Sequence, residues 1–180
     1  IHGVVATQTT TPPQTLFDDW YLPSKEELNL MYVNLYLINY VLYGFDTGGS
    51  RVYWSSSEYN NDEAWFHYFV SNQEDHAYKG TSTYHSRACR AFTSLMNYNL
   101  RDVGPAGGWV FYKNGNDYLE AAPSDFNHKV WSNVYNIEIG TTGTAIGTGQ
   151  ANTTAIINQV GHTDSAAKLC DDGFEDALVH

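Results

Sequence analysis

The spacing of apolar residues changes partway along this chain, and that change most constrains its fold. Ser24 followed three residues later by Glu27 is the signature of a capping box, and apolar residues then continue on one helical face to Leu35. Over residues 51–93 the apolar residues instead alternate with polar ones, as in half-buried strands joined by turns. A helix followed by a run of short strands predicts the α+β class.

After the first helix, the sequence predicts five strands, a loop and a further helical stretch. Expected strands cover residues 52–55, 64–70, 87–92, 107–114 and 118–121, and an Asn-Gly turn follows the fourth of these. A glycine-rich loop spans 140–149, and Asn152 is expected to cap a helical stretch over 153–171 that is interrupted near Gly161. Residues 1–16, with a Pro-Pro pair, predict an extended arm or linker, and residues 173–180 an acidic tail.

Charge and composition limit the kinds of partner that the chain is expected to bind. Twenty acidic residues against nine basic ones give a formal charge of -11, which opposes binding to phosphate backbones, so we expect no nucleic-acid partner. No apolar run reaches the length of about 20 residues that spans a bilayer, so we expect no membrane insertion. Fourteen tyrosines and fifteen glycines are typical of recognition surfaces, and equally of a rigid scaffold with many turns.

Several segments resemble the Lcl C-terminal-like domain family, which has a C-type lectin-like fold and occurs in bacterial surface adhesins and phage tail-type proteins. The first half carries FDDWYLPSKEELNLMY (17–32), VYWSSSEYN (52–60), AWFHYF (64–69) and SRACRAF (86–92). The second half carries VGPAGGWVFYKNGNDYLEAAPSD (103–125), VWSN (130–133), IGTTGTAIGTGQANTTAI (139–156) and SAAKLCDD (165–172). The resemblance implies a single domain over 17–172, with two helices packed on a small twisted antiparallel sheet.

The order of the two halves departs from the family. The family's C-terminal half stands at 17–94 and its N-terminal half at 103–172, which indicates a circular permutation. The resemblance then implies that the strands on either side of the 93–106 connection lie next to each other as a hairpin. An exchange of halves or of the arm between neighbouring chains, giving a homopolymer, is an alternative that composition does not exclude.

The resemblance also implies a disulfide between Cys89 and Cys170, because domains of this fold commonly tie the first helix to the last strand. Such a bridge would place the chain in an oxidising compartment, as a secreted protein or at a cell or virion surface. The alternative is a pair of buried thiols.

We expect no catalytic residue, no metal and no cofactor. His67, His76 and His85 fall in different strands and loops and form no metal-ligand motif. Neither cysteine has the neighbours of a thiol enzyme, and the serine run 55–57 lacks the surroundings of a catalytic triad.

Polar and aromatic side chains interleave with apolar positions between residues 57 and 86, as in retroelement-diversified binding proteins of the same fold. The expected ligand-binding residues are Tyr59, Asn60, Asn61, Asp62, His67, Tyr68, Asn72, Asp75, His76, Tyr84 and His85. Polar loops on a sheet are the alternative interpretation.

The leading hypothesis is a non-enzymatic extracellular adhesion module that recognises a protein or a glycan at a cell or virion surface. The second hypothesis is a structural subunit of an extracellular filament or sheath, assembled by arm or half-domain exchange.

Overall fold

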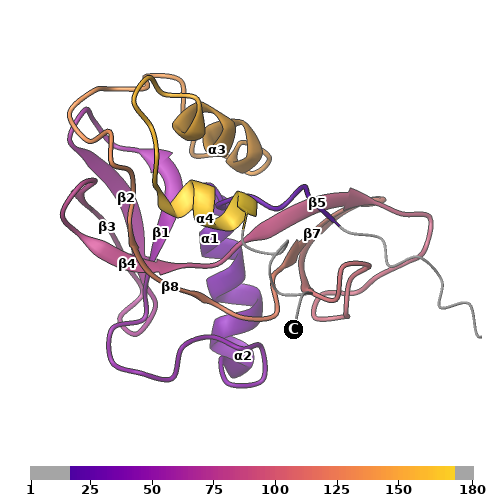
Figure 1. Cartoon of the computed structure of the whole chain (residues 1–180). Helices are drawn as coiled ribbons and strands as arrows, with labels where there is room; N and C mark the ends of the chain where they lie inside the picture. The colour runs from indigo at the N-terminus through magenta and orange to yellow at the C-terminus, as the bar shows by residue number, and fades with distance from the viewer. Residues whose placement is uncertain (1–16, 173–180) are drawn as a thin grey trace, which may run out of the picture.

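Residues 17–172, the part that the computed structural model describes, form three helical segments and two sheets (Figure 1). The predicted arm 1–16 and tail 173–180 lie outside this part. The first helical segment joins α1 (Lys25–Met31), the π-helical η1 (Tyr32–Tyr36) and α2 (Leu37–Asn39). The strands are β1 (Val52–Glu58), β2 (Glu63–Tyr68), β3 (Gln73–Tyr78), β4 (Thr83–Ser86), β5 (Cys89–Thr93), β6 (Trp109–Asn114), β7 (Asp117–Ala121) and β8 (Phe126–Val130). The other helices are α3 (Gly149–Ile157) and α4 (Ala166–Asp172).

The predicted start of the first helix is confirmed. The backbone N–H of Glu27 donates to the Ser24 hydroxyl at 3.3 Å, and the N–H of Ser24 donates back to the Glu27 carboxylate at 2.8 Å. Both orphan donors of the first turn are thereby satisfied, as a capping box requires. Leu28, Met31 and Leu35 are buried beneath the helix, so the apolar stripe faces the core.

The strands form a five-stranded sheet in the order β3-β2-β1-β4-β8 and a three-stranded sheet in the order β5-β7-β6. All neighbours are antiparallel except β1 and β4, which run parallel. The α+β class is confirmed, whereas the expected single small sheet is wrong. The sheets separate at Arg87, between β4 and β5, whose buried guanidinium donates to the Asp125 carboxylate (2.7 Å) and the Gly44 carbonyl (2.8 Å). These contacts hold the chain away from a continuous strand.

The expected hairpin across residues 93–106 is also wrong, because β7 lies between β5 and β6. The two-residue turn Gly115-Asn116 closes β6 and β7 into a hairpin, with Gly115 at positive φ, and leaves the second edge of β7 open to β5. Arg90 of β5 donates to the buried Glu120 of β7 at 2.7 Å. This charged contact joins β5 to the central strand.

The predicted helical stretch near the C-terminus is interrupted as expected, and it forms the separate helices α3 and α4. Asn152 is not the N-cap of α3, since Thr148 holds that position. Asn152 lies inside the helix, where its amide donates to the Gly143 carbonyl (2.7 Å) and accepts from the Gly143 N–H (2.8 Å). The residue therefore anchors the preceding glycine loop.

Two clusters of buried side chains lie on opposite faces of β1. Tyr53 packs in one cluster with the first helical segment, and its neighbour Trp54 packs in the other with Trp131 of the segment after β8. Successive strand residues point to opposite faces, so β1 is covered on both sides. None of the helices in residues 17–172 has the length and apolar character that a membrane span requires.

The expected disulfide is not formed, since Cys89 and Cys170 are both free, buried thiols. Burial raises the pKa of both thiols. Cys89 interacts with the Tyr21 hydroxyl and packs in the first cluster, whereas Cys170 belongs to the second. Burial therefore favours the neutral, unreactive thiol at both positions, and Glu27 and Cys170 also raise the pKa of Cys89.

Candidate functional site

Three aromatic side chains meet at one edge of the five-stranded sheet, and we call them the aromatic cluster: Tyr59, Trp65 and His76. The rings of Tyr59 and His76 stack with centroids 3.8 Å apart and an angle of 5° between their planes. Trp65 of β2 stands opposite His76 of β3 in the strand register and meets both rings edge-on. The cluster is half-exposed, so its rings are ordered by one another while they remain accessible.

Charged side chains fix the rings of the aromatic cluster from two sides. A carboxylate oxygen of Glu63 lies 3.1 Å from Nδ1 of His76. The ammonium of Lys25, at the start of α1, lies 4.4 Å from the centre of the Trp65 ring and 3.0 Å from the Glu74 carboxylate. A cation over an exposed indole contributes about 0.5–1 kcal/mol. The first helix therefore helps to orient the cluster.

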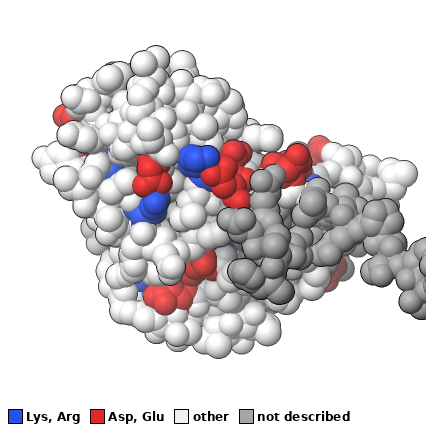
Figure 2. All heavy atoms as spheres, in the orientation of Figure 1, with Lys and Arg blue, Asp and Glu red and all other residues white. Residues whose placement is uncertain are grey.

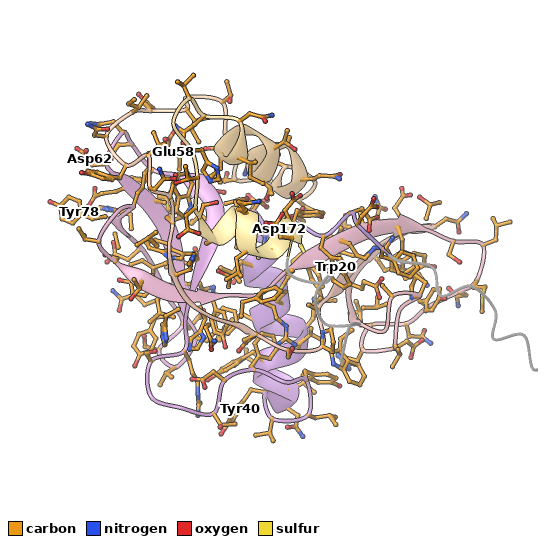
Figure 3. All side chains as sticks on the ribbon, in the orientation of Figure 1. Trp20, Tyr40, Glu58, Asp62, Tyr78 and Asp172 are labelled. Atoms are coloured by element: carbon orange, nitrogen blue, oxygen red, sulfur yellow. The ribbon has the colours of Figure 1, made fainter. Side chains whose placement is uncertain are left out.

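The turn between β1 and β2 carries the neighbouring polar residues. The Asn60 side-chain oxygen accepts from the backbone N–H of Asp62 (2.9 Å) and of Glu63 (2.8 Å), which closes an Asx-type turn. Asn61 is exposed, and its amide donates to the Asp62 carboxylate at 3.0 Å. Asp62 and Tyr78 project at the same edge of the molecule (Figure 3). The turn thus presents Asn61 and Asp62 on an ordered backbone.

A buried ion pair beneath the surface holds the backbone of this turn. The Lys79 ammonium contacts the Glu58 carboxylate and donates to the Asn61 carbonyl at 2.9 Å. Glu58 also accepts from the backbone N–H groups of Ile139 (3.0 Å) and Gly140 (2.9 Å). The 139–140 loop is thereby tied to the turn, and the charge of Lys79 is balanced within the fold.

The structure brings only some of the expected ligand-binding residues together. The residues gathered at the cluster and its turn are Tyr59, Asn60, Asn61, Asp62, Asp75 and His76. Asp75 lies beside His76, with its carboxylate 3.7 Å from Nε2 of that histidine.

The remaining expected residues lie elsewhere. His67 is buried against Tyr32 with ring centres 4.7 Å apart, it shares a hydrogen bond of 3.1 Å with the exposed Asn72, and burial lowers its pKa. Tyr84 packs on Trp54 on the opposite face of the sheet.

His85 and Tyr68 are also separated from the cluster. His85 is buried and packs against His128, with ring centres 4.0 Å apart and 40° between the ring planes. Tyr68 stands at the far end of β2, opposite Gln73. The eleven expected residues therefore do not form one continuous surface, and six of them gather at a smaller surface around the aromatic cluster.

Sequence reasoning missed two members of this surface. Trp65 lies within the expected strand 64–70 and Lys25 within the first turn of the expected helix, and neither was among the expected ligand-binding residues. The contact between the Lys25 ammonium and the Trp65 ring joins elements far apart in the sequence, so no local signal indicated it. Within residues 17–172, no group of three or more His, Cys, Asp or Glu side chains is arranged to hold a metal ion.

Comparisons of the chain with family models, with curated proteins and with solved structures gave no match. The class of molecule that the structure itself defines is an α+β protein with an ordered aromatic and polar surface at one sheet edge.

Proposed function

We propose that this chain is a non-enzymatic binding module, and that the aromatic cluster and the 60–62 turn contact a protein or glycan ligand. The stack of Tyr59 on His76, with Trp65 edge-on, carries the proposal. Tyrosine and tryptophan give a large contact area at low cost in conformational entropy, and they dominate the binding energy of many interfaces. The adjacent asparagines add adaptable hydrogen bonding.

The side chains of this surface are already held in place, which supports a role in binding. Glu63 and Lys25 hold His76 and Trp65 before any ligand arrives. A surface whose side chains are fixed in advance loses less entropy when it binds. Binding therefore needs little rearrangement of the side chains at this edge.

We also propose that the chain is a circularly permuted relative of the Lcl C-terminal-like domain family with a C-type lectin-like fold, acting outside the cell or on a surface. The sequence segments given above support the family. Trp20 and Cys170 belong to one buried cluster, and Figure 3 shows Trp20 and Asp172 near each other. The two halves thus approach each other at the point where the family's chain would be continuous.

The test measures capture of cells or of glycan and protein arrays by the full chain and its variants. We expect Tyr59→Ala combined with Trp65→Ala to reduce capture at least tenfold, because the two largest contact areas are removed, while Tm changes little. Tyr98→Ala is the matched control, since Tyr98 is a half-buried tyrosine that packs on Phe92 and Tyr118, away from the cluster. Unchanged capture by the double variant would refute the assignment of this surface.

A second candidate, a self-assembling structural subunit, is favoured by an apolar helix face. Its side chains are each 45% to 59% exposed and lie on η1, on α2 and in the turn that follows: Val33, Leu37, Ile38, Val41 and Leu42. Residues 32–45 contain no charge, and the surface around α2 is white in Figure 2. A helix that is apolar all round is normally buried. Copies of a chain of charge -11 repel each other least at an uncharged face.

This candidate is tested by light scattering over a range of protein concentrations. We expect the mass to rise above that of a monomer, and we expect Ile38→Glu with Leu42→Glu to restore the monomer. Leu95→Glu is the matched control, because Leu95 is an exposed apolar residue on the loop after β5. If the wild-type chain is a monomer at every concentration, the proposal of a self-assembling subunit is refuted.

A further inference from the structure

A shallow depression of about 370 Å³ lies beyond the end of β3, next to the 60–62 turn. Its lining residues are Asp62, Tyr78, Gly80, Thr81 and Tyr135. Tyr78 is 62% exposed and Tyr135 is 54% exposed, although both are large aromatic side chains. Neither tyrosine belongs to the aromatic cluster.

The shape of the depression depends on Gly80. A Cβ atom at this position would come within 2.5 Å of two atoms of the Tyr135 ring. The ring therefore lies directly on the Gly80 backbone, where a larger residue would displace it. The backbone of Tyr78 is fixed separately, since this residue pairs with Glu63 in the strand register. The two tyrosines thus stand on different segments of the chain.

The charge of the depression is negative. Asp62 is the only acidic lining residue, and no basic residue lines the depression. The adjacent cation, Lys79, is fully buried and balanced by Glu58. The chain as a whole carries a charge of -11, which raises the local concentration of cations.

Aromatic faces attract cations, and aromatic side chains commonly recognise quaternary ammonium groups. A carboxylate beside the rings, as Asp62 is here, adds an opposite charge. A bare metal ion fits the lining poorly, because calcium takes six to eight oxygen ligands. An alkylammonium group is weakly hydrated and presents methyl groups to the tyrosine rings.

We propose that this depression binds an alkylammonium group, with Tyr78 and Tyr135 contacting its methyl groups and Asp62 balancing its charge. Thr81 also lines the depression and offers a hydroxyl to a polar substituent of the same ligand. The site goes beyond the proposed function, because it can hold a cation whatever the aromatic cluster binds. The group can come from a trimethyllysine side chain of a protein or from a choline headgroup of a lipid.

The test titrates the full chain with choline and with 3,3-dimethylbutan-1-ol, which has the same shape without the charge, and follows tyrosine signals by NMR. We expect saturable shifts with choline and at least about tenfold weaker binding of the neutral alcohol. Added salt should weaken only the choline response. Equal binding of the two compounds, or no saturable choline binding, would overturn the proposal.

Variants assign the response to the depression. We expect Asp62→Asn, Tyr78→Ala and Gly80→Ala each to weaken choline binding at least fivefold, the last by displacing the Tyr135 ring. Asp117→Asn is the matched control, since Asp117 is an exposed carboxylate on β7. Gly80→Ala could also unfold the chain, so Asp62→Asn, which keeps size and backbone, decides the outcome. Choline binding that survives Asp62→Asn and Tyr78→Ala contradicts the site.

Two further arms identify the source of the cation. Binding of a trimethyllysine peptide in competition with choline would indicate a protein, and binding of phosphatidylcholine vesicles would indicate a lipid. Tyr59→Ala with Trp65→Ala should leave choline binding intact. Failure of the choline site and failure of the aromatic cluster are therefore measured separately.

Discussion

The buried ion pair of Lys79 and Glu58 gives the sharpest test of how the candidate surface is supported. The Lys79 side chain is fully buried, and it donates to the Glu58 carboxylate and to the Asn61 carbonyl. A hydrogen bond to a charged group contributes about 1.5–3 kcal/mol, and removing one partner of a buried pair costs about 3–5 kcal/mol. Lys79→Met keeps most of the apolar stem, so little cavity is left. We expect it to lower the free energy of unfolding by about 3–5 kcal/mol.

Urea denaturation at neutral pH measures this loss, and an unchanged slope would show that the unfolded state is the same. Lys79→Met combined with Glu58→Gln should recover part of the loss, because the uncompensated buried charge is removed while one side-chain oxygen remains for the 139–140 loop. Lys168→Met is the control, since Lys168 pairs with Asp172 at the surface and should change stability by less than about 1 kcal/mol. A loss below about 1 kcal/mol in Lys79→Met would refute the reasoning about buried charge.

Three further outcomes are expected. Burial lowers the folded-state pKa of His67 below the unfolded value of about 6.5, so its contribution to stability is full above that pH and is lost as the pH falls below it. His67→Gln should flatten the decline of Tm below about pH 6.5, and parallel curves of Tm against pH would contradict this. Denatured protein should titrate with two free thiols and Tm should not respond to reductant, because Cys89 and Cys170 are unbridged; a reductant-dependent Tm would contradict the free thiols. Ser24→Ala should cost about 1 kcal/mol in urea denaturation through loss of the helix cap, and a neutral effect would argue against the capping box.

Local signals in the sequence were sufficient to predict the elements whose ends are marked by capping or turn residues. The Ser24–Glu27 capping box placed the start of the first helix, and the Asn-Gly pair at the end of β6 indicated the hairpin of β6 and β7, whose turn residues are Gly115 and Asn116. Both signals act within a few residues, so no tertiary information is needed to interpret them.

Pairing between distant segments was not predictable in the same way. β3 and β8 were missed because their sequences, QEDHAY and FNHKV, are mostly polar and lack a clear apolar alternation. Both are edge strands of the five-stranded sheet, where one side of each strand lacks a partner and burial is slight. The pairing of β7 with β5 joins residues far apart in the sequence, such as Arg90 and Glu120, so no local signal indicates it.

The division of the expected site has a geometric cause. The strand register places His67 and His76 on the same face of the sheet, on neighbouring strands. The first helical segment crosses this face with Lys25 near Trp65 and Tyr32 over His67. His67 is therefore covered, while His76 lies beyond the start of the helix. A period of two identifies the face of a strand residue, but it contains no information about how far a helix extends over that face.

The π-helical segment η1 has a consequence for how the first helical segment tolerates changes in length. A π-helical turn contains about one residue more than an α-helical turn, and each residue turns the α-helix by about 100°. Deleting one residue within Tyr32–Tyr36 would let the segment close as a regular α-helix while leaving α1 docked on the sheet. Because the wider turn absorbs the extra residue, everything from Leu37 onward would keep its direction about the helix axis. A single codon lost here would therefore leave the uncharged apolar face on the same side of the molecule, whereas the same loss within α1 would turn the segment that follows by about 100° relative to the part that orders Trp65.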